Sequence, residues 1–397
     1  KAGRLVDVAA GRVRNDQVVL VQDGKITAVG PAGATPVPAG AKVIDLSSQT
    51  VLPGMIDTHT HITSDPATPP YYHYGISVPR QALVGVRCAR DTLLSGVTTI
   101  RNVGAAGYTD IALRDAINAG DVIGPRILAS GPALGITGGH CDSNMLAPEF
   151  AERAEGVADG PVAVRTVVRR TVKYGADVIK YCGTGGVFSK GTRVGAQQFT
   201  PEEVAAIVDE AHMHGRKVAV HAHGANGIKV ALRAGVDTIE HASLIDDEGL
   251  KLAKEKGAFL SMDIYNTEYT QSEGPKRGEL EEFLRKDREV AQAQRDNFRK
   301  AVQMGIKLTM GTDTGVHPHR DAPKQLATMV DYGMSPMQAI QAATWVGAQA
   351  LGIEGEVGQI APGYAADIIA VSGDPLANVR AFADVGFVMK GGEVYKQ

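Results

Sequence analysis

The chain has 397 residues, 44% hydrophobic and 21% charged, which suits one large globular domain with a smaller one beside it. Its 41 basic and 44 acidic residues give a net charge of −3 without long blocks of either sign, so nucleic acid and anionic membranes are not expected partners. No apolar run reaches the ~18 residues that span a bilayer.

Short alternating strands separated by Gly and Pro turns are predicted at both ends of the chain. Before the middle they occupy Arg4–Asp7, Val18–Val21, Lys25–Val29 and Lys42–Asp45. After it they occupy Asp367–Val371, Val385–Lys390 and Val394–Lys396. We expect residues 1–50 and 362–397 to pair into one small β-sandwich domain.

The middle of the chain, residues 51–361, contains eight β-branched runs that alternate with helix-period stretches. The runs are Val51–His61, Val97–Gly104, Arg126–Gly131, Val178–Gly183, Val218–His223, Thr238–Ser243, Phe259–Ile264 and Lys307–Asp313. Apolar strands alternating with helices indicate an α/β domain with a parallel sheet covered on both faces, and eight such units favour a closed (β/α)8 TIM barrel. An open doubly wound sheet is the competing architecture.

Two helices have clear boundary signals. Thr200-Pro201-Glu202-Glu203 predicts a helix that runs to about His214 and stops at Gly215, and Ser335-Pro336 predicts another over Met337–Leu351. The polar stretch Thr267–Glu289 could form a lid, but a solvated surface segment is the preferred interpretation.

Neither the cysteines nor the first residues of the chain indicate where the protein is located in the cell. Cys88, Cys141 and Cys182 are an odd number without metal-site spacing, and we expect buried or incidental thiols, not a disulfide framework. Because the chain begins at Lys1 in mid-pattern, we expect a preceding segment to have been removed or left out. Whether that segment was a signal peptide is not readable, so localisation stays open.

Ionisable residues gather where the predicted strands end, which is where barrel enzymes carry their catalytic groups. The first strand ends with His59 and His61, which project to the same side because side chains at i and i+2 of a strand share a face. Both imidazoles can therefore reach one metal ion.

Lys180 stands among apolar residues on the fourth strand, where an unpaired ammonium would cost several kcal/mol. One interpretation is a lysine paired with a carboxylate. The other is a lysine carbamylated by CO2, which becomes an anion able to bridge two metals.

Three further strands end in metal-binding residue types. They end with His221 and His223, with His241, and with Asp313 in a glycine-rich turn. A single buried histidine is usually a satisfied core residue, but histidines at three strand ends together with Lys180 and Asp313 favour a metal site. Nitrogen and oxygen ligands without cysteine make Zn2+ the first expectation, and Mn2+ or Co2+ would also fit.

With these motifs the chain resembles the amidohydrolase superfamily along essentially its whole length. The matching segments are Pro53–His61, Ile179-Lys180, Val220–His223, Ile239–His241, Gly311–Asp313 and Pro362–Ile368. It is most similar to the prolidase-like branch related to imidazolonepropionase, which includes Xaa-Pro dipeptidases and ochratoxin-hydrolysing amidases.

The resemblance implies a ligand set. His59 and His61 would hold the more buried metal, and His221 and His241 the outer one. Lys180, as the carbamate, would bridge both. Asp313 would bind the buried metal and act as the general base.

The resemblance also implies substrate contacts and an assembly state. His140 and Tyr181 would touch the substrate, and His223 would touch it or support the ligands. Members of this branch usually form large homo-oligomers.

The implied activity is a metal-dependent hydrolysis of C–N bonds. The substrate would be a small amide or dipeptide: a dipeptide, an N-acyl amino acid or an ochratoxin-type amide, cut at its C-terminal amide bond as in a prolidase or carboxypeptidase. A hydroxide bridging the two metals would attack, while Asp313 moves the proton.

Three alternatives remain. A deaminase would use one metal and a His-x-x-Glu pair, but Gly224 stands three residues after His221. A cyclic-amide hydrolase such as imidazolonepropionase lacks the bridging lysine. A non-catalytic assembly protein on the same fold would have lost ligands that this chain retains.

Overall fold

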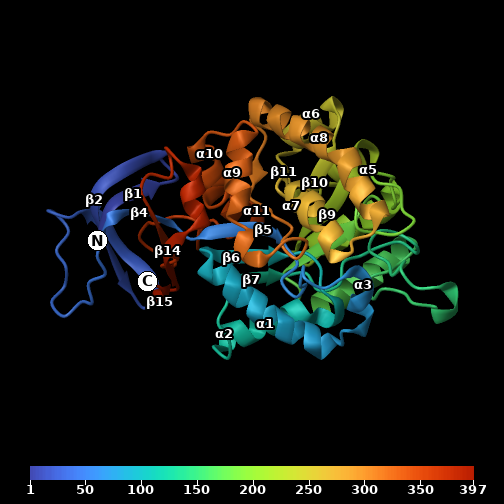
Figure 1. Ribbon diagram of the computed structural model, residues 1–397, viewed down its shortest axis with the longest axis horizontal. Helices are drawn as coiled ribbons and strands as arrows, with labels where there is room; N and C mark the ends of the chain where they lie inside the picture. Colours follow the sequence, from blue (N-terminus) through green and yellow to red (C-terminus); the bar gives the residue numbers. More distant parts are fainter.

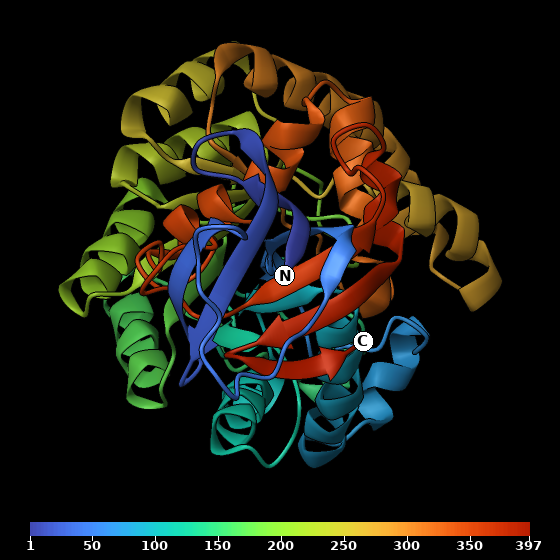
Figure 2. The same ribbon diagram turned by 90° about the vertical axis from the view of Figure 1, so that its left-hand side faces the viewer.

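The computed structural model describes residues 1–397, and its strands form three sheets (Figure 1). One mixed sheet of seven strands is built from the two chain ends, and two parallel sheets of three and five strands come from the middle. The mixed sheet lies at one end of the molecule (Figure 1), and the view onto that end shows helices around the parallel strands (Figure 2).

The mixed sheet joins the first and last parts of the chain in the order β15-β14-β13-β4-β1-β2-β3. Its strands are β1 (Ala2–Asp7), β2 (Arg12–Gln22), β3 (Lys25–Pro31), β4 (Leu46–Pro53), β13 (Ile368–Ser372), β14 (Val385–Lys390) and β15 (Glu393–Lys396). The two ends meet where β4 pairs antiparallel with β13. This arrangement is consistent with the predicted β-sandwich.

Two sequence predictions are wrong near the entry to the parallel sheets. The predicted strand Lys42–Asp45 does not form, because β4 begins only at Leu46. The run Val51–His61 is not one strand but is divided at Gly54 between β4 and β5 (Met55–Thr60). A Cβ on Gly54 would lie 2.1 Å from Thr98 Oγ1, so only glycine fits where the chain passes from one sheet to the next.

The parallel strands occur at all eight predicted positions. One sheet contains β5, β6 (Val97–Asn102) and β7 (Arg126–Ala129); the other contains β8 (Val178–Cys182), β9 (Lys217–Gly224), β10 (Thr238–Leu244), β11 (Phe259–Ser261) and β12 (Leu308–Thr309). Isolated parallel bridges join Thr60 to Thr314 and Leu134 to Tyr181, so backbone contacts connect the two sheets on both sides. The carboxyl ends of the strands consequently face one region.

Helices follow the strands. They are α1 (Val78–Leu94), α2 (Thr109–Ala119), α3 (Pro161–Lys173), α4 (Pro201–Met213), α5 (Ala225–Ala234), α6 (Asp247–Lys256), α7 (Asn266–Glu273), α8 (Glu281–Met304), α9 (Lys324–Asp331), α10 (Pro336–Ala342) and α11 (Trp345–Leu351). No helix combines the length and apolar character that crossing a membrane requires.

The predicted helix starts are confirmed, but one predicted helix is interrupted. Thr200 caps α4 through a capping box with Glu203, and the helix ends just before His214. The predicted helix Met337–Leu351 consists of α10 and α11, because Thr344 between them has φ −139° and ψ −92°.

The segment Thr267–Glu289 is not simply a solvated surface segment. It contains most of α7, a short 3-10 turn and the start of α8. Lys286 and Asp287 are buried, and Phe283 packs edge-to-face on Phe188. This part of the chain forms a wall of the cavity described next.

Candidate metal centre

A cavity of about 800 Å³ opens at the carboxyl ends of the parallel strands. The side chains predicted as metal ligands all line it: His59, His61, Lys180, His221, His241 and Asp313. The structure therefore brings together residues from five strands that are up to 254 positions apart, counted from 59 to 313.

A first cluster joins β5 to the turn after β12. Asp313 Oδ1 lies 3.3 Å from His59 Nε2 and 3.2 Å from His61 Nε2. Two backbone hydrogen bonds fix this pairing, from Asp313 N to His59 O at 2.8 Å and from His61 N to Thr314 O at 2.7 Å. The three side chains offer ligand atoms to one point.

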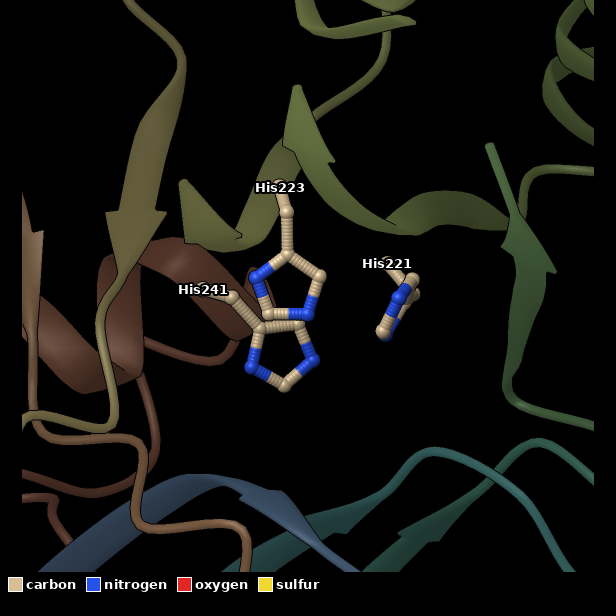
Figure 3. Close-up of side chains that lie close together, drawn as sticks. All are labelled: His221, His223 and His241. Carbon is tan, nitrogen blue, oxygen red and sulfur yellow. The ribbon is translucent and has the colours of Figure 1, made fainter. Parts of the chain in front are cut away.

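A second cluster contains His221 and His223 from β9 and His241 from β10 (Figure 3). The rings of His223 and His241 are stacked with centroids 4.7 Å apart, and the centroid of His221 lies 4.5 Å from that of His241. His223 therefore lies about as close to His241 as the other predicted ligand, His221, does.

Backbone strain coincides with these ligands. His241, Ala242 and Asp313 have φ of 68°, 49° and 56°, in the left-handed region that residues with a Cβ rarely adopt. Each such residue costs on the order of 1–3 kcal/mol unless its surroundings hold it. Both His241 and Asp313 line the cavity, so the strained positions coincide with the candidate metal centre.

Lys180 is buried among these groups, with 3% of its surface exposed. Burial lowers its pKa to about 8, although Glu240 works in the opposite direction. No carboxylate oxygen lies within 4.0 Å of its Nζ, so the structure does not show the acid-paired lysine that was the alternative prediction.

The donor atoms fit divalent metal ions. Asp313 Oδ1 and His221 Nε2 are buried without hydrogen-bond partners, and such atoms are costly unless something else satisfies them. The separations of 3.2 and 3.3 Å match the roughly 3.4 Å expected between neighbouring ligands of a tetrahedral ion with bonds of about 2.1 Å.

In three of the histidines, His61, His223 and His241, Nδ1 has a polar partner, which leaves Nε2 for a metal. His61 Nδ1 lies 3.2 Å from Gly104 O, and His223 Nδ1 lies 2.9 Å from Ser243 Oγ. Outer partners of this kind fix the tautomer and the orientation of a metal-binding imidazole.

The carboxylate that orients the ring of His59 was not predicted from the sequence. Glu240 Oε2 lies 3.1 Å from His59 Nδ1, and Arg101 Nη2 donates to Glu240 Oε1 at 2.7 Å. Burial alone would raise the pKa of Glu240, but Arg101 and His59 hold it well below its usual range. Glu240 directly precedes His241 in the sequence, but no local sequence pattern indicates that its carboxylate contacts His59 instead.

A second missed support surrounds Asp263, which follows β11. Its Oδ1 lies 2.9 Å from His241 Nδ1 and accepts a hydrogen bond from Gln294 at 2.9 Å. Asn266 Nδ2 donates to Asp263 Oδ2 at 2.7 Å and to Asp313 Oδ2 at 3.1 Å. A single amide thus connects Asp313 of the first cluster to Asp263, the support of His241 in the second.

His140, one of the predicted substrate contacts, lies in the cavity against a proposed ligand. Its ring stacks on His221 with centroids 4.0 Å apart, and its Nδ1 lies 2.9 Å from Ser189 Oγ. A Cβ on Gly186 would come within 2.5 Å of the His140 ring, so glycine is needed there. Burial lowers the pKa of His140 to about 3.

Tyr181 is not brought into the cavity. It is fully buried, packs edge-to-face on Phe199, and is absent from the cavity wall. The reason is strand geometry: Tyr181 follows Lys180 directly on β8, and successive side chains point to opposite faces.

The prediction about cysteines is wrong for two of the three. Cys141 and Cys182 form a disulfide with their Cα atoms 5.9 Å apart, while Cys88 is free and buried. Both bonded cysteines line the cavity. The disulfide fastens the loop that carries His140 to the end of β8, close to Lys180.

The chain is similar to known proteins along most of its length. The model of the amidohydrolase family matches residues 50–395. Ochratoxinase of Aspergillus niger is 33% identical over 370 residues, which cover 87% of this chain and 75% of that protein.

Two solved structures share the whole fold. A Xaa-Pro dipeptidase with methionine bound in its active site is 37% identical, with a TM-score of 0.93 and coverage of 100% of this chain and 98% of the other. A prolidase in complex with N-methylphosphonate-L-proline is 29% identical, with the same TM-score and the same coverage. The predicted resemblance and the α/β class are confirmed.

Proposed function

This chain belongs to the amidohydrolase family, and we propose that it is a two-metal hydrolase that cleaves the amide bond next to a C-terminal amino acid. Its substrates would be dipeptides or N-acyl amino acids. The observation that carries this proposal is the meeting of two donor clusters and a buried lysine in one cavity. Similarity to ochratoxinase and to dipeptidases supports the choice of amide bond.

The architecture that we propose is the closed (β/α)8 barrel over residues 51–361, with 1–50 and 362–397 as the β-sandwich domain. Backbone bridges between the three-stranded and the five-stranded parallel sheets support closure. The break at Gly54 supports a domain boundary close to the proposed one.

In this proposal His59, His61 and Asp313 would hold one metal ion, and His221 and His241 would hold the other. Lys180, if carbamylated by CO2, would be the residue to hold both, and its burial without an acidic partner supports this role. Zn2+ suits the nitrogen and oxygen donors. When bound, the two ions supply Lewis acidity toward the scissile carbonyl and lower the pKa of an attacking water.

The side chains of this protein then have distinct tasks. Asp313 accepts the proton of the attacking water on its carboxylate and returns it to the leaving nitrogen. Asn266 holds Asp313 Oδ2 in place for that transfer. His140 faces the cavity beside His221, where it can contact the substrate. His223 lies at the second cluster and can support the metal or the substrate.

We further propose that the free carboxylate of the C-terminal amino acid is recognised. A pair of metal ions favours an anionic substrate. The prolidase in complex with N-methylphosphonate-L-proline and the dipeptidase with bound methionine both hold a ligand that ends in an amino acid.

The proposal is tested by metal analysis together with a substrate panel. Purified protein should contain about two metal ions per chain, and it should hydrolyse members of a panel of Xaa-Pro dipeptides and N-acyl amino acids. About one ion per chain would favour a deaminase or a cyclic-amide hydrolase. Absence of metal and of turnover would favour a non-catalytic assembly protein.

A further inference from the structure

Arg277 differs from the other cations in the wall of the cavity. The cationic residues that line the cavity are Arg153, Lys180, Lys190 and Arg277. Lys180 is buried among the metal-ligand candidates, and Lys190 is exposed to solvent. The side chain of Arg153 is 55% exposed and that of Arg277 only 19%. Arg277 is therefore a partly desolvated cation of the cavity wall that is not itself among the candidate metal ligands.

Its guanidinium is held in one orientation by two neighbours. Arg277 Nη1 donates to the carbonyl of Pro66, in the loop that follows β5. Its Cζ lies 5.0 Å from the ring centre of Tyr269 on α7. The contact with Pro66 ties the segment after β11 to the loop after β5 across the cavity. A charged group fixed in this way loses little further freedom when it binds a ligand.

The opposite edge of the guanidinium makes no hydrogen bond within the protein. Nε is buried and has no hydrogen-bond partner, and Nη2 has only Glu279 Oε2 nearby, at 3.8 Å, beyond hydrogen-bonding distance. Nε and Nη2 carry two parallel N–H bonds, the arrangement that binds a carboxylate through both oxygens.

We propose that Arg277 binds the free α-carboxylate of the C-terminal amino acid of the substrate through this Nε–Nη2 edge. The inference rests on the proposed function and names the residue that decides its specificity. It replaces Tyr181, which does not reach the cavity, and it leaves His140 and His223 to the region of the metal ligands.

The test compares one substrate with and without its carboxylate. The wild type and Arg277→Met are assayed with Met-Pro and with its C-terminal amide, Met-prolinamide, or with an N-acyl amino acid and its amide if that class is turned over. Arg277→Met should lower kcat/KM for the free acid by about 10-fold or more and change it for the amide by less than about 3-fold. Arg277→Lys, which keeps the charge but loses the paired N–H bonds, should retain only part of the preference.

Arg153→Met is the matched control, because Arg153 lines the same cavity but donates to Val157 O and faces Asp159 at 3.6 Å. It should keep the acid-to-amide ratio of the wild type. Metal content and the thermal midpoint are measured for every variant, and Arg277→Lys serves if Arg277→Met does not fold.

Two failures are distinguishable. A wild-type preference for the acid that survives in Arg277→Met and in Arg277→Lys overturns the role of Arg277 alone. Equal rates for acid and amide in the wild type overturn carboxylate recognition itself, and with it this part of the proposed function.

Discussion

Asn266 Nδ2 donates to Asp313 Oδ2 at 3.1 Å while it also donates to Asp263 Oδ2 at 2.7 Å. Contact with two carboxylates fixes which end of the amide carries the hydrogens, because the reversed side chain would set its oxygen against two anions. Asn266 thus links the proposed general base to the carboxylate that orients His241.

Replacing Asn266 should slow the chemical step more than it weakens substrate binding. In Asn266→Ala the carboxylate of Asp313 loses a donor and gains freedom, so kcat should fall by about 10-fold with KM little changed. Asn266→Asp should be slower still, because it adds a third carboxylate beside two others. Asn297→Ala, which removes only a bond to Ser243 O, is the control. Wild-type kcat in Asn266→Ala would show that Asp313 does not need this contact.

Asp313→Asn should preserve the fold and reduce kcat by at least ~10²-fold, the usual scale for loss of a general base. The amide is nearly isosteric and keeps the backbone bond to His59 O, so circular dichroism should be unchanged. Steady-state kinetics at saturating substrate measure the effect. Activity close to that of the wild type would place the base on another residue.

Lys180→Ala should lose both activity and bound metal, since the buried amine is the proposed bridge. Short carboxylic acids such as acetate or propionate should restore part of both by occupying the vacated space as anions. Metal analysis with and without added acid measures this directly. Lys190→Ala, an exposed cavity residue, should bind metal like the wild type. Undiminished metal in Lys180→Ala would contradict the bridging role.

The positions of the candidate ligands were predictable because they obey local rules. His59 and His61 share one face by the two-residue period of a strand, and strand ends meet at one side of a parallel arrangement. The prediction that Tyr181 contacts the substrate did not take this rule into account. Its neighbour Lys180 faces the site, so the side chain of Tyr181 points to the opposite face.

The supporting residues were not predictable, because they reach the site from segments without a local signature. Asn266 begins α7 and Gln294 lies within α8, in or near a stretch whose composition resembles a solvated surface. The division at Gly54 depends on a contact with Thr98, 44 residues away, counted from 54 to 98. Such contacts are fixed by tertiary packing and leave no periodic pattern.

The pairing of Cys141 with Cys182 can be checked by counting thiols. In denaturant without reductant one thiol per chain, that of Cys88, should react with a thiol reagent, and after reduction all three should react. In the native protein Cys88 should stay unreactive, because it is buried and its pKa is raised to about 12. Three reactive thiols before reduction would show that the disulfide is absent.

Glu210 provides a stability prediction with a defined pH dependence. On α4 it accepts bonds from Arg169 Nε at 2.6 Å and Arg165 Nη1 at 3.1 Å, both on α3, and these contacts lower its pKa from 4.5 to about 2. A carboxyl whose pKa is lower in the folded state stabilises the protein above pH 4.5 and loses that contribution as the pH falls toward 2. Glu210→Gln should therefore reduce the free energy of unfolding by about 1–2 kcal/mol at pH 7 and by less at pH 3.

Urea unfolding of the metal-free protein at both pH values measures the difference. The control is Asp209→Asn, because the side chain of Asp209 is 62% exposed. A deficit that stays equal at pH 7 and pH 3 would mean that packing, and not the charge of Glu210, holds α3 to α4.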